Sequence, residues 1–315
     1  MKMKNSGEHL LKLELNRPFI SVIVPSFNYA SFLREALDSV LNQTFENFEI
    51  IVIDDGSRDS SLEIISEFQK KTSKLRFYQH ENHQNLGLPS SLRLGLEKAR
   101  GTWIAVLEAD DVWSIECLEK RVEAVLSSNV DFCCNKIQAI VEKGGNKVWF
   151  DSYVPRVEKK LSQLQAKMGS FDLHQLILQE NLIPTFSCAM VKKEILSRCD
   201  FETPVASWLD WFLWCQVLQE TEGVFIEQPL TYWRLHSDSQ NSKKNFFQFL
   251  KNYSLFRRAI IKRLSLIQCK GHKAKIAYLS QPVLFPLIFR TLKGVREIGF
   301  FPFFSQILKR IKLFD

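Results

Sequence analysis

The sequence predicts an α/β fold in which helices cover a mostly parallel sheet. Short runs of β-branched and other apolar residues alternate with segments whose apolar residues recur at three-to-four spacing, and short connections join them. This alternation is typical of strand–helix–strand units, whose strands are buried on both faces. Clusters of polar and acidic residues follow the apolar runs directly. Ligands of such folds bind beyond the carboxyl ends of the strands, so these clusters are the candidate site.

The N-terminal half alternates regularly. Residues 20–24 are a β-branched run that Pro25 ends, and Ser31 is a candidate cap for the helix that follows. Residues 48–53 predict a second buried strand, and a helical pattern then continues to about Lys71. The other elements expected in this half are a strand at 75–79, a loop at 81–88, a helix from Pro89 to Arg100 and a strand at 103–107.

Beyond residue 130 the pattern is more mixed. Residues 130–141 and 147–150, joined through Gly144-Gly145-Asn146, predict a β-hairpin. The elements expected after it are a strand at 186–191, an aromatic-rich helix at 207–220 and one or two strands at 224–234.

Length and composition fit a folded enzyme-sized chain. At 315 residues, one large domain with an appendage, or two domains, is expected. The seven cysteines are odd in number and form no Cys-x-x-Cys pair, which favours buried, reduced thiols in a cytosolic compartment. The N-terminus lacks the apolar run of a signal peptide.

The charge is divided unevenly along the chain. Residues 241–315 hold 16 Lys and Arg, 2 acids and 11 Phe, a net charge of +14, whereas residues 1–240 carry −7. An acidic body with a basic tail indicates a separate partner for the tail. We therefore divide the chain into a tail (1–17), a catalytic-type domain (18–240) and a basic, Phe-rich helical region (241–315).

The sharpest polar feature is the acidic segment Glu108–Asp111. It places three carboxylates within four residues, immediately after the apolar run 103–107. Such carboxylates repel one another unless a cation neutralises them, and oxygen ligands favour hard ions such as Mg²⁺ or Mn²⁺. The alternative is a solvated acidic turn.

Two further clusters close the first two predicted strands. Pro25–Tyr29 offers Phe27 or Tyr29 as an aromatic face and Asn28 for polar contacts, although a capped strand end is the simpler reading. Asp54-Asp55-Gly56-Ser57 follows the second run, where a turn with a helix cap is the alternative.

The order of these clusters resembles glycosyltransferase family 2, which has the GT-A fold. The matching segments are residues 21–29, Gln43-Thr44-Phe45, residues 51–57, Asn85-Leu86-Gly87 and residues 107–111, and they occur in the family's order and spacing. The resemblance is specific over about residues 18–113, looser to about 240 and absent beyond. It implies an inverting, nucleotide-sugar-dependent glycosyltransferase.

The resemblance also implies roles for these segments at the donor. Pro25, Phe27, Asn28 and Tyr29 would hold the nucleobase and ribose, and Asp55 would accept a hydrogen bond from the base, with Asp54 nearby. Glu108 and Asp110 would face the donor, and Asp110 and Asp111 would hold the Mg²⁺ or Mn²⁺ that grips its diphosphate. The family has Asp where Glu108 stands and an Arg near Leu92. Arg93 is offset from that Arg by one residue, which leaves its contact with the phosphate open.

Two later segments complete the resemblance. Asp210 lies at an apolar, Trp-rich helix start, where the family has Glu-Asp, and it is the expected base that deprotonates the acceptor. The alternative for Asp210 is a carboxylate that the helix dipole favours. Trp208 and Trp211 would form either a wall for a sugar or part of the core. His236 resembles the His of the family's Arg-x-His segment and is a candidate third metal ligand or a structural histidine.

The basic tail predicts contact with an anionic membrane surface. Its longest apolar run, residues 283–289, is far shorter than the roughly 20 residues of a span. Residues 246–266 and 300–314 suit amphipathic helices on such a surface. Nucleic-acid binding is the alternative that we disfavour, because the acidic body would repel a polyanion; packing on the catalytic domain also stays open.

Together these features predict a transferase at the cytoplasmic face of the cell membrane, held there peripherally. It would move a sugar from a nucleotide-sugar, most simply a UDP-sugar, to a hydroxyl of a lipid-linked or polysaccharide-precursor acceptor in cell-surface glycan synthesis. Two rivals are a sugar nucleotidyltransferase, which would show a Gly-rich phosphate loop, and a non-catalytic nucleotide-sugar-binding or membrane scaffold protein.

Overall fold

A computed structural model of the chain describes residues 18–168, 176–237 and 246–266. The chain divides into two compact units at Ile260, and the first of them holds the sheet and the pocket described below. None of the described helices combines the length and the apolar character that a bilayer span needs.

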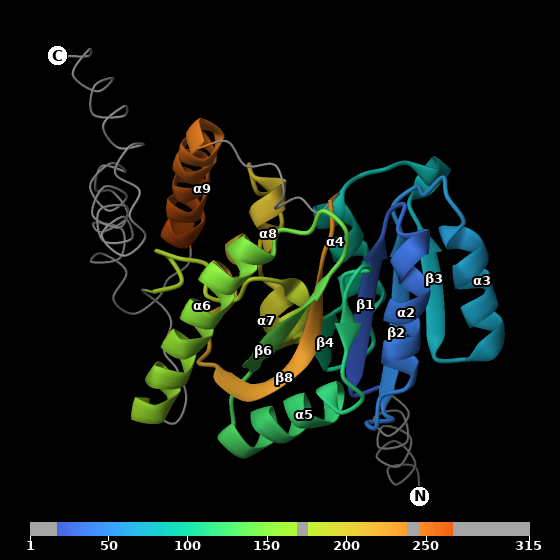
Figure 1. Cartoon of the computed structure of the whole chain (residues 1–315), viewed down its shortest axis with the longest axis horizontal. Coiled ribbons are helices and arrows are strands. Elements are labelled where there is room, and N and C mark those ends of the chain that lie inside the picture. Colours follow the sequence, from blue (N-terminus) through green and yellow to red (C-terminus); the bar gives the residue numbers. More distant parts are fainter. Residues whose placement is uncertain (1–17, 169–175, 238–245, 267–315) are drawn as a thin grey trace, which may run out of the picture. The chain divides into compact units, whose positions relative to one another are not determined.

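One mixed sheet of eight strands organises the fold, in the order β3-β2-β1-β4-β7-β6-β8-β5 (Figure 1). The first four strands of that order are parallel, which confirms the expected βα units. β7 runs antiparallel to both of its neighbours, β8 runs parallel to β6, and β5 pairs antiparallel with β8. The strands are β1 (Ile20–Ser26), β2 (Phe48–Asp54), β3 (Leu75–Gln79), β4 (Trp103–Val106), β5 (Val112–Trp113), β6 (Phe132–Val141), β7 (Ala189–Lys192) and β8 (Val224–Leu235).

Helices flank this sheet. The α-helices are α2 (Ala30–Leu41), α3 (Ser61–Lys71), α4 (Leu88–Lys98), α5 (Cys117–Ser128), α6 (Lys147–Met168), α7 (Lys193–Ser197), α8 (Leu209–Val217) and α9 (Phe246–Leu266). Short 3₁₀ turns are η1 (Glu81–His83), η2 (Phe186–Cys188) and η3 (Ala206–Trp208).

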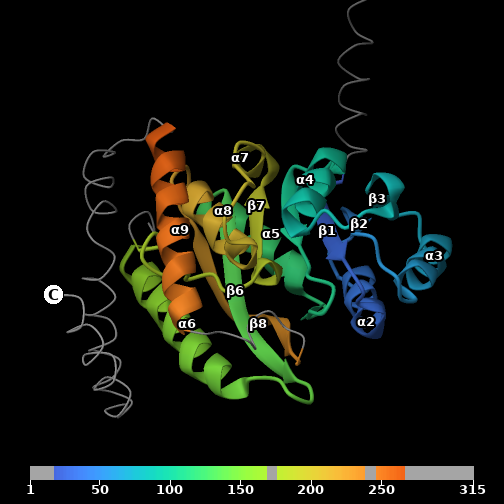
Figure 2. The ribbon, with the colours of Figure 1, turned by 90° about the horizontal axis from the view of Figure 1, so that it is seen from above.

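The parallel half is covered on both faces, with α2 and α3 on one side and α4 on the other (Figure 2). Because strand side chains alternate between faces, β1 serves both layers. Val22 and Val24 join the core beneath α2 and α3. Ile23 points the other way, where a Cβ added at Gly95 of α4 would lie 2.5 Å from its Cγ2. The glycine therefore allows the close approach of α4 to the sheet.

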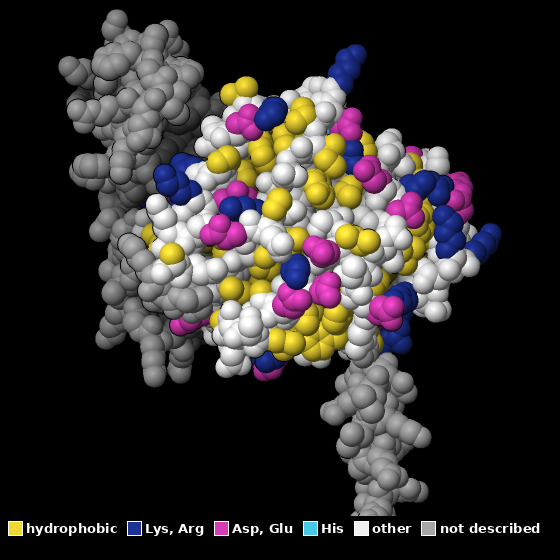
Figure 3. Space-filling model, turned by 60° about the horizontal axis from the view of Figure 1, so that its bottom comes forward, with side chains coloured by type: hydrophobic (Ala, Val, Ile, Leu, Met, Phe, Trp, Pro, Cys, Tyr) yellow, Lys and Arg dark blue, Asp and Glu magenta, His cyan; other side chains and the backbone are white. Residues whose placement is uncertain are grey.

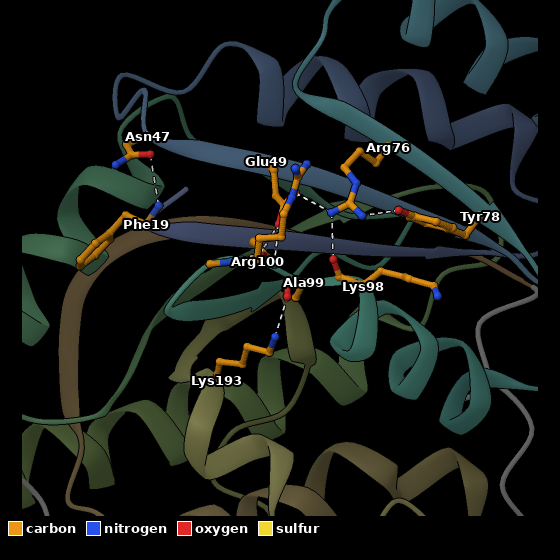
Figure 4. A network of polar contacts seen from close by, with 11 residues as sticks. Phe19, Asn47, Glu49, Arg76, Tyr78, Lys98, Ala99, Arg100 and Lys193 are labelled. Carbon is orange, nitrogen blue, oxygen red and sulfur yellow. Dashed lines mark hydrogen bonds and ion pairs between the residues drawn. The ribbon is translucent and has the colours of Figure 1, made fainter. Parts of the chain in front are cut away.

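A buried carboxylate ties three parts of the parallel half together (Figure 4). Glu49, which is 4% exposed, accepts hydrogen bonds from Arg76 Nη1 at 2.9 Å, Arg100 N at 2.7 Å and Ser21 Oγ at 2.8 Å. Burial alone would raise the pKa of Glu49, but the bonds from Arg100, Arg76 and Ser21 outweigh it and hold that pKa below its ordinary value. The ionised Glu49 thus joins β1, β2, β3 and the segment that follows α4.

The prediction of a hairpin over residues 130–150 is wrong for its second strand. β6 forms as predicted, but residues 147–150 begin α6 instead of a strand. The reason is local, because Asn146 Oδ1 accepts a hydrogen bond from Trp149 N at 3.0 Å, which is the geometry of a helix N-cap. The predicted cap at Ser31 is also wrong, since α2 begins at Ala30 after Tyr29.

Helix α9 forms over the predicted residues 246–266, and part of it packs on α8. The Phe256 ring stacks on Trp211 with centroids 4.3 Å apart and also contacts Trp208 and Phe212. Trp208 and Trp211 are 8% and 7% exposed, so of the two roles left open for them the structure shows core packing. The second predicted amphipathic segment, residues 300–314, lies outside the described residues.

The described surface and cysteines show no unusual feature. The face in Figure 3 mixes acidic, basic and apolar side chains, and no single charge sign dominates it. The six cysteines in the described part of the chain form no disulfide with one another, and five of them are buried.

Candidate functional site

An open pocket of about 820 Å³ lies beyond the carboxyl ends of β1, β2 and β4. Its wall continues through the turn before η2, the start of α8 and the end of β8. The structure thus brings together clusters that are far apart in sequence. The predicted site residues that line this pocket are Pro25, Phe27, Asn28, Tyr29, Asp55, Glu108, Asp110, Asp210 and His236.

The loop after β1 is fixed by its own polar groups. Asn28 has a left-handed backbone with φ of 57°, and its Oδ1 accepts a hydrogen bond from Arg58 N at 2.8 Å. Its main-chain N–H donates to Ser57 Oγ at 2.9 Å. These bonds hold the loop after β1 against the loop after β2. Phe27 remains 41% exposed, so its ring is available at the pocket.

The loop after β2 presents Asp55 to the pocket. Its two carboxylate oxygens accept hydrogen bonds from Leu86 N at 2.8 Å and Gly87 N at 2.9 Å. A carboxylate has about four acceptor positions, so Asp55 keeps capacity for a further donor. The loops meet closely here, because a Cβ added at Gly56 (φ +81°) would lie 2.5 Å from the carbonyl oxygen of His83.

Asp54 does not line the pocket. It is the last residue of β2, it is fully buried, and its Oδ2 accepts hydrogen bonds from Gly56 N at 3.2 Å and Ser57 N at 3.1 Å. The predicted contact between Asp54 and a donor is therefore corrected to a cap of the turn that presents Asp55.

The acidic segment Glu108–Asp111 follows β4, and Glu108 and Asp110 line the pocket. The Glu108 carboxylate accepts a hydrogen bond from the Thr185 hydroxyl, and its main-chain N–H donates to Ser187 Oγ at 3.0 Å. Burial and then the charge of Asp110 raise the pKa of Glu108 to about 8, against the effect of the Thr185 bond. Acidic side chains are therefore crowded at this edge of the sheet.

Asp111 lies behind the pocket wall. It is fully buried, and its Oδ1 accepts a hydrogen bond from Arg234 N at 2.9 Å. Burial, followed by the charges of Asp110 and Glu108, raises the pKa of Asp111 well above its ordinary value. Its carboxylate joins the acidic segment to β8, a placement that does not favour the predicted direct contact of Asp111 with a cation.

Asp110 meets His236 across the sheet. Asp110 Oδ2 lies 3.1 Å from His236 Nε2, and the edge of the Tyr29 ring lies against the imidazole. Arg234 fixes this meeting, because its Nε donates to the main-chain oxygen of Asp110 at 2.9 Å and its Nη1 to Glu142 at 2.6 Å. The end of β8 is thereby locked onto the acidic segment.

The donor set at Asp110 and His236 suits a partly hydrated hard cation. No group of three or more His, Cys, Asp or Glu in the described ranges could hold a metal by protein ligands alone. Mg²⁺ is commonly held by one or two carboxylates together with substrate phosphates and waters. Two protein ligands in an acidic pocket fit an ion that a phosphate completes.

Asp210 faces the same pocket from the first turn of α8. Its Oδ2 accepts a hydrogen bond from Asn181 Nδ2 at 3.0 Å. Asp210 also contributes to raising the pKa of Glu108. The charges of Asp210 and Glu108 therefore interact within the pocket.

Arg93 is not part of this pocket. Its side chain is exposed and its guanidinium lies 5.9 Å from the centroid of the Phe201 ring. Leu92, one position earlier, lies on the buried face of α4. The one-residue offset turns Arg93 away, so its predicted contact with the donor is corrected.

Several pocket residues were not predicted. Ser26 Oγ is buried at the pocket wall and has no hydrogen-bond partner among the described residues. Thr185 and Trp233 line the pocket too, and Asn181 supports it from the preceding loop. Ser26 belongs to the first motif, so its position was a usable signal; nothing in the sequence marks Thr185 or Asn181.

Comparison with protein families and known proteins gives one consistent result. Residues 21–199 match the family model described as glycosyl transferase family 2. A protein of Haemophilus influenzae named as an uncharacterized glycosyltransferase is 36% identical over 181 residues, which are 57% of this chain and 70% of that protein. A relative from Rickettsia felis is 29% identical over 236 residues, but the chain spans only 36% of its length.

Solved structures share the architecture. A crystal structure of TarS from S. aureus in complex with UDP-GlcNAc has a TM-score of 0.62 at 19% identity, over 82% of this chain and 71% of that one. The mannosyltransferase PcManGT from Pyrobaculum calidifontis, in complex with GDP-Man and Mn²⁺, has a TM-score of 0.55 at 16% identity, over 94% and 80%. The GT-A architecture expected from the sequence is thereby confirmed.

Proposed function

Since the chain belongs to glycosyltransferase family 2, we propose that it transfers a sugar from a nucleotide-sugar donor to an acceptor hydroxyl with inversion. The observation that carries this proposal is the pocket itself. Asp55, Asp110, His236 and Asp210 come from four distant segments and line one cavity beyond the strand ends. The residues proposed to bind the nucleotide and the proposed carboxylate base thus share one cavity.

The nucleoside would bind between the loops after β1 and β2. The exposed Phe27 ring offers an apolar face, Asp55 has remaining acceptor capacity for a ring N–H, and Ser26 Oγ is a buried hydroxyl without a described partner. Buried polar groups are normally hydrogen-bonded, so a polar group of the donor that pairs with Ser26 Oγ would satisfy this hydroxyl. UDP is the first candidate for the nucleoside diphosphate part of the donor.

The donor diphosphate would lie near Asp110 and His236. Among the described residues that line the pocket none is Lys or Arg, and four are carboxylates: Asp55, Glu108, Asp110 and Asp210. An anionic diphosphate cannot enter such a surface without compensation. Mg²⁺ or Mn²⁺, held by Asp110 and His236, would supply Lewis-acid stabilisation of the charge that develops on the leaving diphosphate.

Asp210 would take the proton of the acceptor hydroxyl. It lines the pocket from the first turn of α8, next to Ser207 and Leu209, which also line the cavity. A general base must reach the attacking hydroxyl directly, and a carboxylate at a pocket wall meets that need. Attack from the Asp210 side, opposite the leaving group, gives inversion at the sugar.

The similar structures support the donor class. TarS is described in complex with UDP-GlcNAc and PcManGT with GDP-Man and Mn²⁺. These two compounds are therefore the first probes. Isothermal titration of each, with and without Mn²⁺, tests the proposal: Mn²⁺-dependent binding of at least one nucleotide-sugar supports it, and no binding across a wider set that includes dTDP-sugars contradicts it.

A product assay with the same donors separates the rival functions. A sugar nucleotidyltransferase would form a nucleotide-sugar and pyrophosphate from a nucleoside triphosphate and a sugar phosphate, without transfer to a hydroxyl. A non-catalytic binding or scaffold protein would bind the donor without ever forming a product. The presence of Asp210 at the pocket favours the transferase over both.

We further propose that the C-terminal region contacts an anionic membrane surface, which would bring the pocket to a lipid-linked or polysaccharide-precursor acceptor. α9 holds five Lys and Arg and no Asp or Glu. Lys251, Arg258 and Lys262 are exposed along it, whereas Tyr253, Phe256 and Ile260 are buried. This placement is peripheral, at the cytoplasmic side, where anionic lipids attract basic helices.

Vesicle co-sedimentation tests that second proposal. Binding to vesicles containing phosphatidylserine that falls with added salt, and is absent with phosphatidylcholine alone, supports it. Binding to neither, or equal binding to duplex DNA at the same ionic strength, contradicts it.

A further inference from the structure

Asn181 has its side-chain amide and its main-chain oxygen engaged beside the proposed base. Its Nδ2 donates to Asp210 Oδ2 at 3.0 Å, and its Oδ1 accepts a hydrogen bond from Ile183 N at 3.2 Å. Its main-chain oxygen accepts a hydrogen bond from the Tyr153 hydroxyl. The side chain is therefore held at Oδ1 and the backbone at its carbonyl oxygen, with the NH₂ group directed at Asp210.

Tyr153 is itself fixed from α6. Its ring stacks on Trp149 with centroids 5.2 Å apart and an interplanar angle of 26°. Trp149 in turn meets the edge of Trp233, a residue of the pocket wall, at 5.5 Å. Burial, followed by the charge of Asp210, raises the pKa of Tyr153 far above its ordinary value, so its hydroxyl stays a donor.

This arrangement orients the Asp210 carboxylate and favours its ionised form, as a general base requires. One oxygen of Asp210 accepts a hydrogen bond from the Asn181 NH₂ group, which does not itself take up a proton. This bond orients the carboxylate relative to the incoming hydroxyl. A hydrogen bond to the charged form also favours ionisation. Small misplacements of a reacting group are costly in rate, so orientation matters as much as charge.

We propose that Asn181 is a positioning residue that orients the proposed base Asp210, and that Tyr153 holds Asn181 in place. The inference rests on the proposed role of Asp210 in the transfer. It gives a role in catalysis to the loop of residues 176–185, which carries none of the family's recognisable motifs.

The competing explanation is that Asn181 merely stitches this loop to α8. Asn181→Asp tests the contact between the two side chains, because it keeps the shape of the side chain and an acceptor for Ile183 N, but places a second carboxylate 3.0 Å from Asp210. The kinetics of Asn181→Ala then separate the two explanations, since stitching alone predicts a lower thermal stability at an unchanged kcat. Gln165→Ala is the matched control. It also removes an amide that bonds to main chain, here to Phe225 O at 2.8 Å, but away from the pocket.

The contact is measured by the carboxyl ¹³C NMR titration of protein labelled at aspartate, in which the Asp210 signal is assigned by its absence in Asp210→Asn. We expect Asn181→Asp to raise the Asp210 pKa by about one unit or more, as two carboxylates sharing a site do. Asn181→Ala and Tyr153→Phe should raise it less, and Gln165→Ala not at all. An unchanged titration in Asn181→Asp overturns the proposal.

Kinetics provide the second readout, with UDP-GlcNAc or GDP-mannose as donor. Asn181→Ala should lower kcat about 10- to 100-fold with the donor KM within about twofold of the parent, and the acid limb of the rate profile in Asn181→Asp should move to higher pH. If Asp210→Asn abolishes transfer but Asn181→Ala leaves kcat unchanged, the positioning role is wrong while the base stands. If Asp210→Asn transfers normally, the proposed function of Asp210 fails instead. Thermal unfolding of each variant shows whether a lost activity reflects a lost fold.

Discussion

Asp110 Oδ2 and His236 Nε2 lie 3.1 Å apart although 126 residues separate them in the chain. β4 brings the first to the sheet edge, and β8 brings the second. Arg234 locks the two segments, since it bonds to the main-chain oxygen of Asp110 and to the carboxylate of Asp111 through separate N–H groups. The contact therefore joins the turn after β4 to the residue that follows β8.

The first prediction follows from that contact. Asp110→Asn or His236→Ala should weaken Mn²⁺-dependent donor binding at least about tenfold, because each removes a candidate metal ligand. Calorimetric titration of UDP-GlcNAc and GDP-mannose with and without Mn²⁺ measures it. Asp111→Asn is the matched control, since that side chain faces Arg234 and should retain most of the metal dependence. Equal losses in Asp111→Asn and Asp110→Asn would contradict this assignment.

Asp55 should act on the nucleoside instead of the metal. Asp55→Ala removes the acceptor for Leu86 N and Gly87 N and for the donor base, so nucleotide affinity should fall about tenfold or more. The loss should be the same with and without Mn²⁺, and it should also appear for free UDP or GDP. A loss confined to the Mn²⁺-containing titration would place Asp55 at the diphosphate.

The contact of α9 with α8 should stabilise the fold. Phe256 is 1% exposed and stacks on Trp211, so Phe256→Ala should cost about 3 to 5 kcal/mol of unfolding free energy. Urea denaturation measures that difference. Lys251→Ala, an exposed position on the same helix, should change the value by about 0.5 kcal/mol or less. Similar values for both variants would mean that the aromatic packing contributes nothing.

The Glu49 network predicts a pH-dependent stability. The folded-state pKa of Glu49 is lowered, so its contribution is fully present above the unfolded pKa and is lost as pH falls through the folded value. Glu49→Gln should therefore destabilise the protein by about 2 kcal/mol at pH 7. The gap between the parent and Glu49→Gln should close below about pH 4. A gap that is constant from pH 7 to pH 3 would show that the charge of Glu49 is not what matters.

Sequence reasoning located the candidate site well because each cluster lies at a strand end, and parallel strands bring their ends to one edge. It could not tell which of two adjacent acids faces the pocket. Asp54 ends β2 and turns inward to cap a turn, while Asp55 emerges; Asp111 turns to Arg234, while Asp110 emerges. Neighbouring residues point in different directions, and only the local backbone decides which is which.

The misread hairpin has a similar origin. Gly144-Gly145-Asn146 is typical of a hairpin turn, but Asn is also a strong helix N-cap, and here it caps α6. Asn181 was missed for another reason. Its role depends on Tyr153 and Asp210, which lie about thirty residues to either side, and no local pattern reveals such a contact.

The measurement that tests the central claim most directly is transfer by the parent protein and by Asp210→Asn, with UDP-GlcNAc or GDP-mannose, Mn²⁺ and lipid-linked or oligosaccharide acceptors. Released nucleoside diphosphate gives the rate, and ¹H NMR gives the anomeric configuration of the product. We predict an inverted glycosidic bond from the parent protein, and donor binding without product from Asp210→Asn. Donor binding without product in the parent protein, or parent-like transfer by Asp210→Asn, would contradict the account.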